Sequence, residues 1–221
     1  MRARTALTPR LALAVGRGLE RLAGAVEAEA VIPLRPAGEL VLGRLDGTAV
    51  AAWTGAPEAS SRERAAPVRL ARMLGADVLV LVRSARRLEP DAAADLAVVE
   101  DQIGFLVPNP LVGPNDEAFG PRFPDLSEPY DPALRALARE QAARSGIALA
   151  SGVYAAHPDP NLATPAEYTI LREAGVAWVG EGGVQEVIVA RHAGMRVLSL
   201  IGLEGAEPEL ATLARSLIAR M

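Results

Sequence analysis

The sequence contains no cysteine and no lysine, and it has little aromatic character. Its 221 residues include two histidines, and Phe, Trp and Tyr together make up 4% of the chain. Without cysteine, disulfides and thiolate zinc sites are excluded, and two histidines argue against a histidine-rich metal site. We therefore expect no metal centre.

Excess positive charge and long apolar runs are also missing. Arginine supplies all 23 Lys and Arg residues, Asp and Glu number 27, and the formal net charge is −4. An acidic balance, without aromatic residues among the arginines, argues against nucleic-acid binding. No run approaches the roughly 18 to 20 apolar residues that span a bilayer, so we expect a cytoplasmic protein that does not enter a membrane.

What the chain does contain is an alternation of strand and helix patterns. Half of the residues are apolar and no linker is visible, which predicts one domain over residues 1–221. The run "ADVLVLV" (76–82) is typical of a strand covered on both faces. Asp46-Gly47 predicts the tight turn of a hairpin within 39–53. Further strands are predicted at 11–15, 95–100, 148–156, 177–180 and 195–202.

Two predicted helices carry clear start signals. Asp131 is a suitable N-cap, Pro132 fits the first helical position, and Gly146 ends the stretch. Thr164 is the second N-cap, and Glu167 completes a capping box. Other helices are predicted near 18–26 and at 61–74, 184–194 and 207–221. Together these elements predict an α/β fold with three layers, in which helices flank a mixed, largely parallel central sheet.

A long stretch between the strand predicted at 95–100 and the helix that begins after Asp131 shows neither the apolar periodicity of a strand nor that of a helix. Residues 104–131 are irregular, and within them "NPLVGPNDEAFGP" (109–121) holds a single ring, Phe119, among turn formers. A structureless loop of such length is unusual inside a compact domain and is usually functional. The loop is therefore a candidate functional segment.

Five segments that extend over nearly the whole chain carry a family resemblance. They are "AGELVLGRLDG", "APVRLARMLGADVLVL", "NPLVGPNDEAFGPRFPDLSEPYDP", "ATPAEYTILREAGVAWVG" and "VQEVIVARHAGMRVLSL". In this order they resemble the trimeric purine nucleoside phosphorylases, a family that also contains methylthioadenosine phosphorylases. The resemblance implies phosphorolysis of a purine nucleoside to base and ribose 1-phosphate. It further implies inorganic phosphate as co-substrate and no cofactor.

The positions that bind phosphate in that family are altered in this sequence. In "GRGLE" two glycines of the family's glycine-rich turn remain, but Arg17 replaces its serine and Glu20 its last glycine. The family's G-R-F-H motif, which supplies an Arg and a His, keeps only Gly55. In "RSARR", Arg83 replaces an asparagine, and Ser84 keeps a position whose N–H can face the anion.

The positions that hold the purine and the ribose are altered as well. In "DPNLATP", Leu162 stands at the position of an aromatic wall and Ala163 at that of a base-binding glutamate. Gly205 aligns with the asparagine that donates to the purine. In "VGEGG", Glu181 replaces the methionine under the ribose, and Gly182 is the next position of the same motif. A charge at an apolar sugar contact needs a partner, which nearby arginines can supply.

Four arginines stand at positions of the former phosphate site: Arg17, Arg83, Arg86 and Arg87. In one interpretation they rebuild an anion site of a different shape, because guanidinium groups suit phosphate and carboxylate. In the other, they fill the vacated pocket and pair with local carboxylates such as Glu181 or Glu204. We favour the second, because bulky side chains now stand where glycines allowed close backbone approach.

The two histidines have different predicted roles. His192 lies in a predicted helix, on the side that faces the core, and we expect it to be structural. His157, in "AAHPDPN", lies near the former base pocket; a ligand contact and a surface loop are equally open. Neither has a carboxylate or hydroxyl partner in a sequence motif, so neither is assigned to acid–base chemistry.

Phe119 has a family role that concerns assembly. In the family, the ring at this position reaches across the subunit interface and closes the neighbour's nucleoside pocket. The resemblance therefore implies a homotrimer; the alternatives are a hetero-oligomer in which Phe119 is donated to an active paralogue, and simple packing in an apolar interface.

These replacements lead to the function predicted from the sequence. We predict a purine nucleoside phosphorylase homologue in which phosphorolysis is impaired or absent, and we assign no catalytic residue. One alternative is a phosphorylase with an altered nucleoside or anionic substrate. The other is a non-catalytic subunit or binding module that pairs with an active paralogue.

Overall fold

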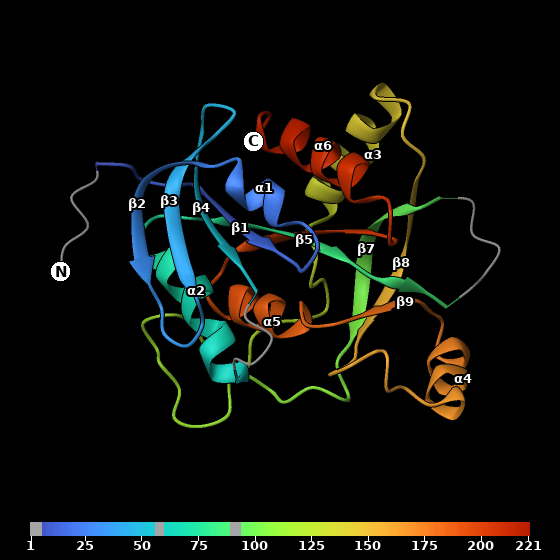
Figure 1. The fold of residues 1–221 in the computed structure, drawn as a ribbon. Helices are drawn as coiled ribbons and strands as arrows, with labels where there is room; N and C mark the ends of the chain where they lie inside the picture. Colours follow the sequence, from blue (N-terminus) through green and yellow to red (C-terminus); the bar gives the residue numbers. More distant parts are fainter. Residues whose placement is uncertain (1–5, 56–59, 89–93) are drawn as a thin grey trace.

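The structure is a computed structural model that describes residues 6–55, 60–88 and 94–221 (Figure 1). Within these residues ten strands form one sheet, in the order β2-β3-β4-β1-β5-β10-β7-β8-β9-β6. The strands are β1 (Leu11–Val15), β2 (Glu27–Pro33), β3 (Glu39–Leu45), β4 (Thr48–Thr54), β5 (Val78–Ser84), β6 (Arg86–Arg87), β7 (Leu96–Ile103), β8 (Leu149–Ala156), β9 (Val176–Gly180) and β10 (Arg196–Gly202). The helices are α1 (Glu20–Gly24), α2 (Ser61–Met73), α3 (Pro132–Arg144), α4 (Pro165–Glu173), α5 (Val184–His192) and α6 (Glu207–Ile218).

The sheet is mixed, with two parallel groups. In the first, β1 lies between β4 and β5 and runs parallel to both, and β10 is parallel to β5. In the second, β7, β8 and β9 are parallel to one another. The two groups meet at the antiparallel pair of β10 and β7. Since Ala85 alone separates β5 from β6, and β6 pairs with β9, the chain also joins the two groups at the end of β5.

Helices cover both faces of this sheet (Figure 1). α2 and α5 pack on one face, where Ala65 and Val187 belong to one apolar cluster. α1, α3 and α6 pack on the other, where Leu22, Leu134 and Leu213 belong to a second cluster. The three-layer α/β fold with a mixed central sheet is therefore confirmed.

The central strand β1 shows why the sheet needs cover on both sides. Leu11, Leu13 and Val15 belong to the cluster with α1, α3 and α6, whereas Ala12 and Ala14 belong to the cluster with α2 and α5. Successive side chains of a strand point to opposite faces, so a continuous apolar run is buried from both sides. The run that predicted a buried strand at 11–15 thus places β1 at the centre of the molecule.

The predicted helix starts are confirmed, while two strands have no counterpart in the sequence prediction. The Asp131 side chain accepts a hydrogen bond from Leu134 N, and Thr164 and Glu167 form the capping box. The strands that the prediction lacks are β2 and β6. The helix predicted at 61–74 is α2, in which Val68 is buried and Met73 is exposed.

Residues 104–131 form neither helix nor strand, as predicted. Local bonds hold part of the loop: the Asn109 side chain accepts from Leu111 N. Asn115 joins more distant groups, because Nδ2 donates to Gly120 O and Oδ1 lies 3.1 Å from Nε2 of His192 on α5. The loop is thereby tied to the layer of α2 and α5.

None of the helices in the described ranges combines the length and the apolar character needed to cross a bilayer.

Candidate functional site

A cavity of about 400 Å³ lies where several strands end. Its wall includes the turn after β1, Gly55 after β4, the end of β5, and the segment between β10 and α6. Glu181, directly after β9, completes it, because β6 brings the end of β5 next to β9. In open α/β sheets ligands bind beyond the carboxyl ends of the strands, so the cavity is the candidate site.

Charged residues of both signs line this cavity. Among the described residues of its wall, the arginines are Arg17, Arg64, Arg83 and Arg86. The glutamates are Glu181, Glu186, Glu204 and Glu207. Four positive and four negative formal charges cancel, so the wall as described has no net charge with which to attract an anion.

Arg83 is a buried member of the cavity wall. It is 6% exposed, and its Nη1 donates to the main-chain oxygen of Glu181 at 3.1 Å. Gly16, Gly182 and Gly183 make room for it. A Cβ on Gly16 would lie 2.7 Å from the Arg83 Cβ, and a Cβ on Gly183 would lie 2.9 Å from the Arg83 Cζ. For Arg83, the interpretation that an arginine fills the vacated pocket fits the geometry.

Gly182 and Gly183 also adopt a backbone conformation that side chains disfavour. Their φ angles are 69° and 89°, in the left-handed region. The Tyr154 hydroxyl donates to Gly182 O at 3.0 Å, and burial raises the pKa of Tyr154, so the hydroxyl stays protonated. The glycine pair thus packs against both the Arg83 guanidinium and the Tyr154 hydroxyl.

The Glu181 carboxylate forms ion pairs with two further guanidinium groups. Arg17 Nη2 lies 3.3 Å from Oε2, and Arg64 Nη2 lies 3.6 Å from Oε1. The predicted pairing of Arg17 with Glu181 is therefore confirmed. Arg64, from the first turn of α2, was not predicted. It follows a stretch that differs from the family motif and that lies partly outside the described residues, so no signal in the sequence pointed to it.

Backbone N–H groups at the cavity rim are also occupied by carboxylates of the chain. Gly18 N donates to Glu20 at 3.0 Å, and Gly205 N donates to Glu207 at 2.9 Å. The Glu20 backbone N–H and the Gly18 N–H stabilise the charged form and lower the pKa of the Glu20 carboxyl. These N–H groups would have to exchange their partner before they could bind an external anion.

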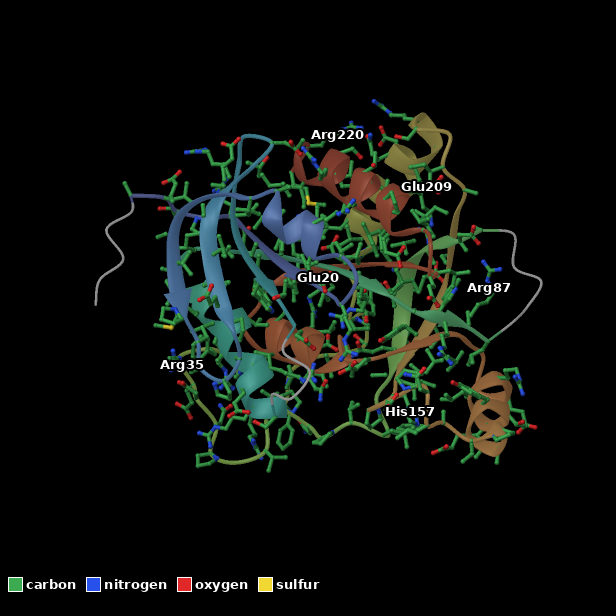
Figure 2. The ribbon with its side chains drawn as sticks, viewed as in Figure 1. Glu20, Arg35, Arg87, His157, Glu209 and Arg220 are labelled. Carbon is green, nitrogen blue, oxygen red and sulfur yellow. The ribbon has the colours of Figure 1, made fainter. Side chains whose placement is uncertain are left out.

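The remaining two arginines of the predicted set form no ion pair with Glu181 in the described residues, and only one of them lines the cavity. Arg86 lines the cavity, and its Nη2 donates to Asn161 Oδ1 at 2.5 Å. Arg87 is not a wall residue: its Nη2 donates to the Ala94 carbonyl oxygen and lies 3.4 Å from Asp95. Figure 2 shows Arg87 at the outer edge of the sheet.

The predicted base-side residues are only partly brought to the cavity. Leu162 and Ala163 are absent from its described wall, and Leu162 is exposed. Their neighbour Asn161 lines the wall instead. Gly205 lies between two wall glutamates. Ser84 does line the cavity, and its buried Oγ has no hydrogen-bond partner among the described residues.

Both histidines are buried. His192 is held by Asn115, and burial, with the charge of Arg69, lowers its pKa. Its predicted position on the core side of the helix is confirmed. His157 lies at the end of β8 (Figure 2), where Nδ1 accepts from Asp159 N at 3.1 Å. Of the two alternatives open for His157, burial excludes an exposed surface loop, and His157 is not part of the described cavity wall.

Phe119 is half-buried on its own chain, away from the cavity wall. It packs against the cluster shared with α2 and α5, and the Arg69 guanidinium lies 5.5 Å from its ring centroid. An aromatic face at this distance favours a cation, so Arg69 holds the ring in place.

Comparison with known proteins agrees with the fold. The model of the family described as the phosphorylase superfamily matches residues 10–214. Over 210 residues the chain is 40% identical to purine nucleoside phosphorylase 1 of Bacillus subtilis (strain 168), covering 87% of this chain and 78% of that protein. The corresponding enzyme of Geobacillus stearothermophilus is 39% identical over 210 residues, with coverages of 87% and 77%.

Structural similarity also relates the chain to a purine nucleoside phosphorylase. The Schistosoma mansoni purine nucleoside phosphorylase, crystallised with a novel monocyclic inhibitor, has a TM-score of 0.89 to this chain at 31% identity, covering 98% of this chain and 92% of that one. The chain thus belongs to the phosphorylase superfamily and is a homologue of the purine nucleoside phosphorylases.

Proposed function

We propose that this purine nucleoside phosphorylase homologue has a remodelled cleft in which phosphorolysis of purine nucleosides is severely impaired. The cleft takes a nucleoside or another anionic metabolite, and inorganic phosphate is the co-substrate of any remaining turnover. No cofactor is required, and the protein forms one domain over residues 1–221.

The observation that carries the proposal is the internal use of the anion-binding groups. The Gly18 N–H of the glycine-rich turn already donates to Glu20, and Arg17, at the serine position of that turn, pairs with Glu181. A phosphate must therefore displace two carboxylates before it reaches these donors. Formal charges that cancel around the described wall give it no long-range attraction to help.

Chemistry after binding is also disfavoured. Loss of one well-placed transition-state donor typically reduces the rate by ~10²- to 10³-fold. The base-side positions Leu162, Ala163 and Gly205 carry no side-chain donor or acceptor for a purine. Even with strong non-additivity, the combined loss reaches several orders of magnitude.

A phosphorolysis assay tests this proposal. The purified protein is incubated with phosphate and inosine, guanosine, adenosine or methylthioadenosine, beside the Bacillus subtilis purine nucleoside phosphorylase 1. We expect kcat/KM at least about 10³-fold below that of the control on every nucleoside. Turnover within about tenfold of the control on any of them would overturn it.

The same chain is proposed to form a homotrimer in the cytoplasm, without nucleic acid or membrane partners. Support comes from the loop of residues 104–131, where Phe105, Val112 and Phe123 are exposed apolar side chains. Large apolar side chains gathered on one segment mark interaction surfaces. In this assembly Phe119 closes the neighbour's cleft.

Light scattering tests the assembly directly. A homotrimer has three times the chain mass of 23.1 kDa. A mass equal to that of one chain at micromolar concentration would contradict the homotrimer. If the trimer appears only after addition of an active paralogue, the mixed assembly is the correct form.

A further inference from the structure

We infer that Glu181 is an internal ligand: its carboxylate occupies an oxyanion site formed by Arg17, Arg64 and Arg83, and an external oxyanion binds only when that carboxylate is displaced. The inference deepens the proposed function, since it rests on the same remodelled cleft. It concerns binding and its control, and requires no turnover.

Three guanidinium groups from three elements meet at this one residue. Arg17 comes from the turn after β1 and contacts Oε2, and Arg64 comes from α2 and contacts Oε1. Arg83, at the end of β5, binds the main-chain oxygen. One cation at each carboxylate oxygen is the arrangement that a bound oxyanion would show, because guanidinium groups recognise paired oxygens.

Two of the cations are held in place without the Glu181 carboxylate. The Arg64 side chain is 14% exposed, and Arg83 is almost fully buried. A Cβ on Gly182 would lie 3.2 Å from Nη1 of both arginines, so the two groups converge beside this glycine. The buried Nε of Arg83 has no hydrogen-bond partner within the described ranges. Arg83 therefore keeps a donor that the described residues leave unpaired beside the Glu181 position, as an unfilled site for an oxygen ligand would show.

The carboxylate itself is placed so that it can leave. One third of the Glu181 side chain is exposed, and Arg17 is 70% exposed. The contacts of 3.3 and 3.6 Å are longer than the ~2.7 to 2.9 Å of a close charge-assisted hydrogen bond. Rotation of the Glu181 side chain into water therefore breaks only long, weak ionic contacts to Arg17 and Arg64.

The chemistry of the site defines the ligand class. Guanidinium groups on two sides favour a group with at least two oxygens that share negative charge, such as a phosphoryl group or a carboxylate. The cavity of about 400 Å³ leaves room for an organic part beside it. The predicted ligand is thus an oxyanion-bearing metabolite that competes with Glu181.

Removal of the internal charge tests the inference. Inorganic phosphate is titrated into the wild type and into Glu181→Gln by calorimetry at constant ionic strength, and the thermal midpoint is followed in parallel. We expect the Kd for phosphate to fall at least about tenfold in the variant, and phosphate to raise its thermal midpoint more than that of the wild type. Glu181→Ala, which leaves no side-chain oxygen for the arginines, is measured beside it. Its affinity for phosphate should rise at least as much.

A matched control removes the same charge from the same wall. Glu204 lines the cavity and is exposed, and no contact between it and the three arginines is found in the described residues. Glu204→Gln changes the net charge by the same amount. Its affinity for phosphate should exceed that of the wild type by less than threefold. Equal gains in Glu204→Gln and Glu181→Gln would show a general charge effect and overturn the inference, as would no gain in either Glu181 variant.

The arginine side is tested in the variant that gains affinity. Adding Arg17→Ala to Glu181→Gln removes one exposed guanidinium and should raise the Kd at least about fivefold again. An unchanged Kd would overturn the site as assigned. Acetate is titrated beside phosphate to show whether the site also accepts a carboxylate; a gain in phosphate affinity, with or without acetate binding, supports the site, and no gain in phosphate affinity overturns it.

Failure of the inference differs from failure of the proposed function. If the wild type turns over nucleosides efficiently, the proposed function fails whatever Glu181 does. If the wild type is inactive and the Glu181 variants do not bind phosphate, the proposed function stands and the internal-ligand role of Glu181 fails.

Discussion

The loop of residues 104–131 and the strand-end cavity are held together in opposite ways. The loop has no regular structure, yet it makes close contacts with α5: Asn115 joins Gly120 to His192. The cavity lies at the ends of regular strands, yet long charged side chains line it and several contact one another at its surface. Irregular backbone is therefore the structural part here, and regular strands carry the part whose chemistry can change.

The largest effect is expected at the closest approach of the loop to α5. A Cβ on Gly120 would lie 1.9 Å from the backbone oxygen of His192, a distance that no side-chain rotation relieves. Gly120→Ala should therefore lower the free energy of unfolding by about 3 kcal/mol or more, measured by urea denaturation.

Gly24→Ala is the matched control for this substitution. No atom lies within 4 Å of a Cβ built on Gly24, and its φ is not positive. We expect a change within about 1 kcal/mol. Equal losses in both variants would show that the loop does not depend on its contact with α5.

A smaller loss is expected when the link between loop and helix is removed. Asn115→Ala leaves Nε2 of the buried His192 without its partner and frees Gly120 O. An unpaired buried polar group costs about 1 to 3 kcal/mol. Asn109→Ala, in the same loop, removes an exposed and purely local bond and should cost less than about 1 kcal/mol. If both Asn→Ala variants lose the same free energy of unfolding in urea denaturation, the link to His192 does not contribute to stability.

The same histidine makes stability depend on pH. Burial and the charge of Arg69 lower the His192 pKa below its ordinary value of 6.5, so the folded protein keeps the ring neutral while the unfolded chain takes up a proton. This stabilisation is fully present above pH 6.5 and decreases as the pH falls through the lowered pKa.

Urea midpoints compared between about pH 7.5 and pH 5.5 should therefore fall more steeply for the wild type than for His192→Gln. His157 is common to both proteins, so its contribution cancels. Parallel pH profiles would show that His192 is not the titrating group.

The fold was largely predictable because the strong local signals agree with it. Asp131 and Thr164 begin their helices as the cap pattern predicts, and the apolar run of β1 lies at the centre of the sheet. β2 escaped prediction because most of its side chains are exposed at an edge of the sheet, so burial imposes no pattern on its sequence. β6 has two residues, too few for any period.

The site was predictable only where a position lies at the carboxyl end of a strand. Arg83 is near the end of β5, Arg17 lies two residues after β1 and Glu181 directly follows β9, and the three meet at the cavity. Arg86 and Arg87 were treated alike, but neighbouring residues in a strand point to opposite sides, so only Arg86 reaches the cavity. Arg64 comes from a helix whose distance to Glu181 depends on tertiary packing, which no local pattern reveals.

The smallest effect on stability is expected in the cavity and completes the comparison with the loop. Arg17 is 70% exposed and makes a single ion pair at 3.3 Å, in which water screens the charges. Arg17→Ala should therefore change the free energy of unfolding by less than about 0.5 kcal/mol in urea denaturation. A loss greater than about 1 kcal/mol would mean that the cavity charges support the fold as the loop contacts do. Glu181 could then not be displaced without cost to the fold, and the contrast between a structural loop and a chemically variable cavity would be wrong.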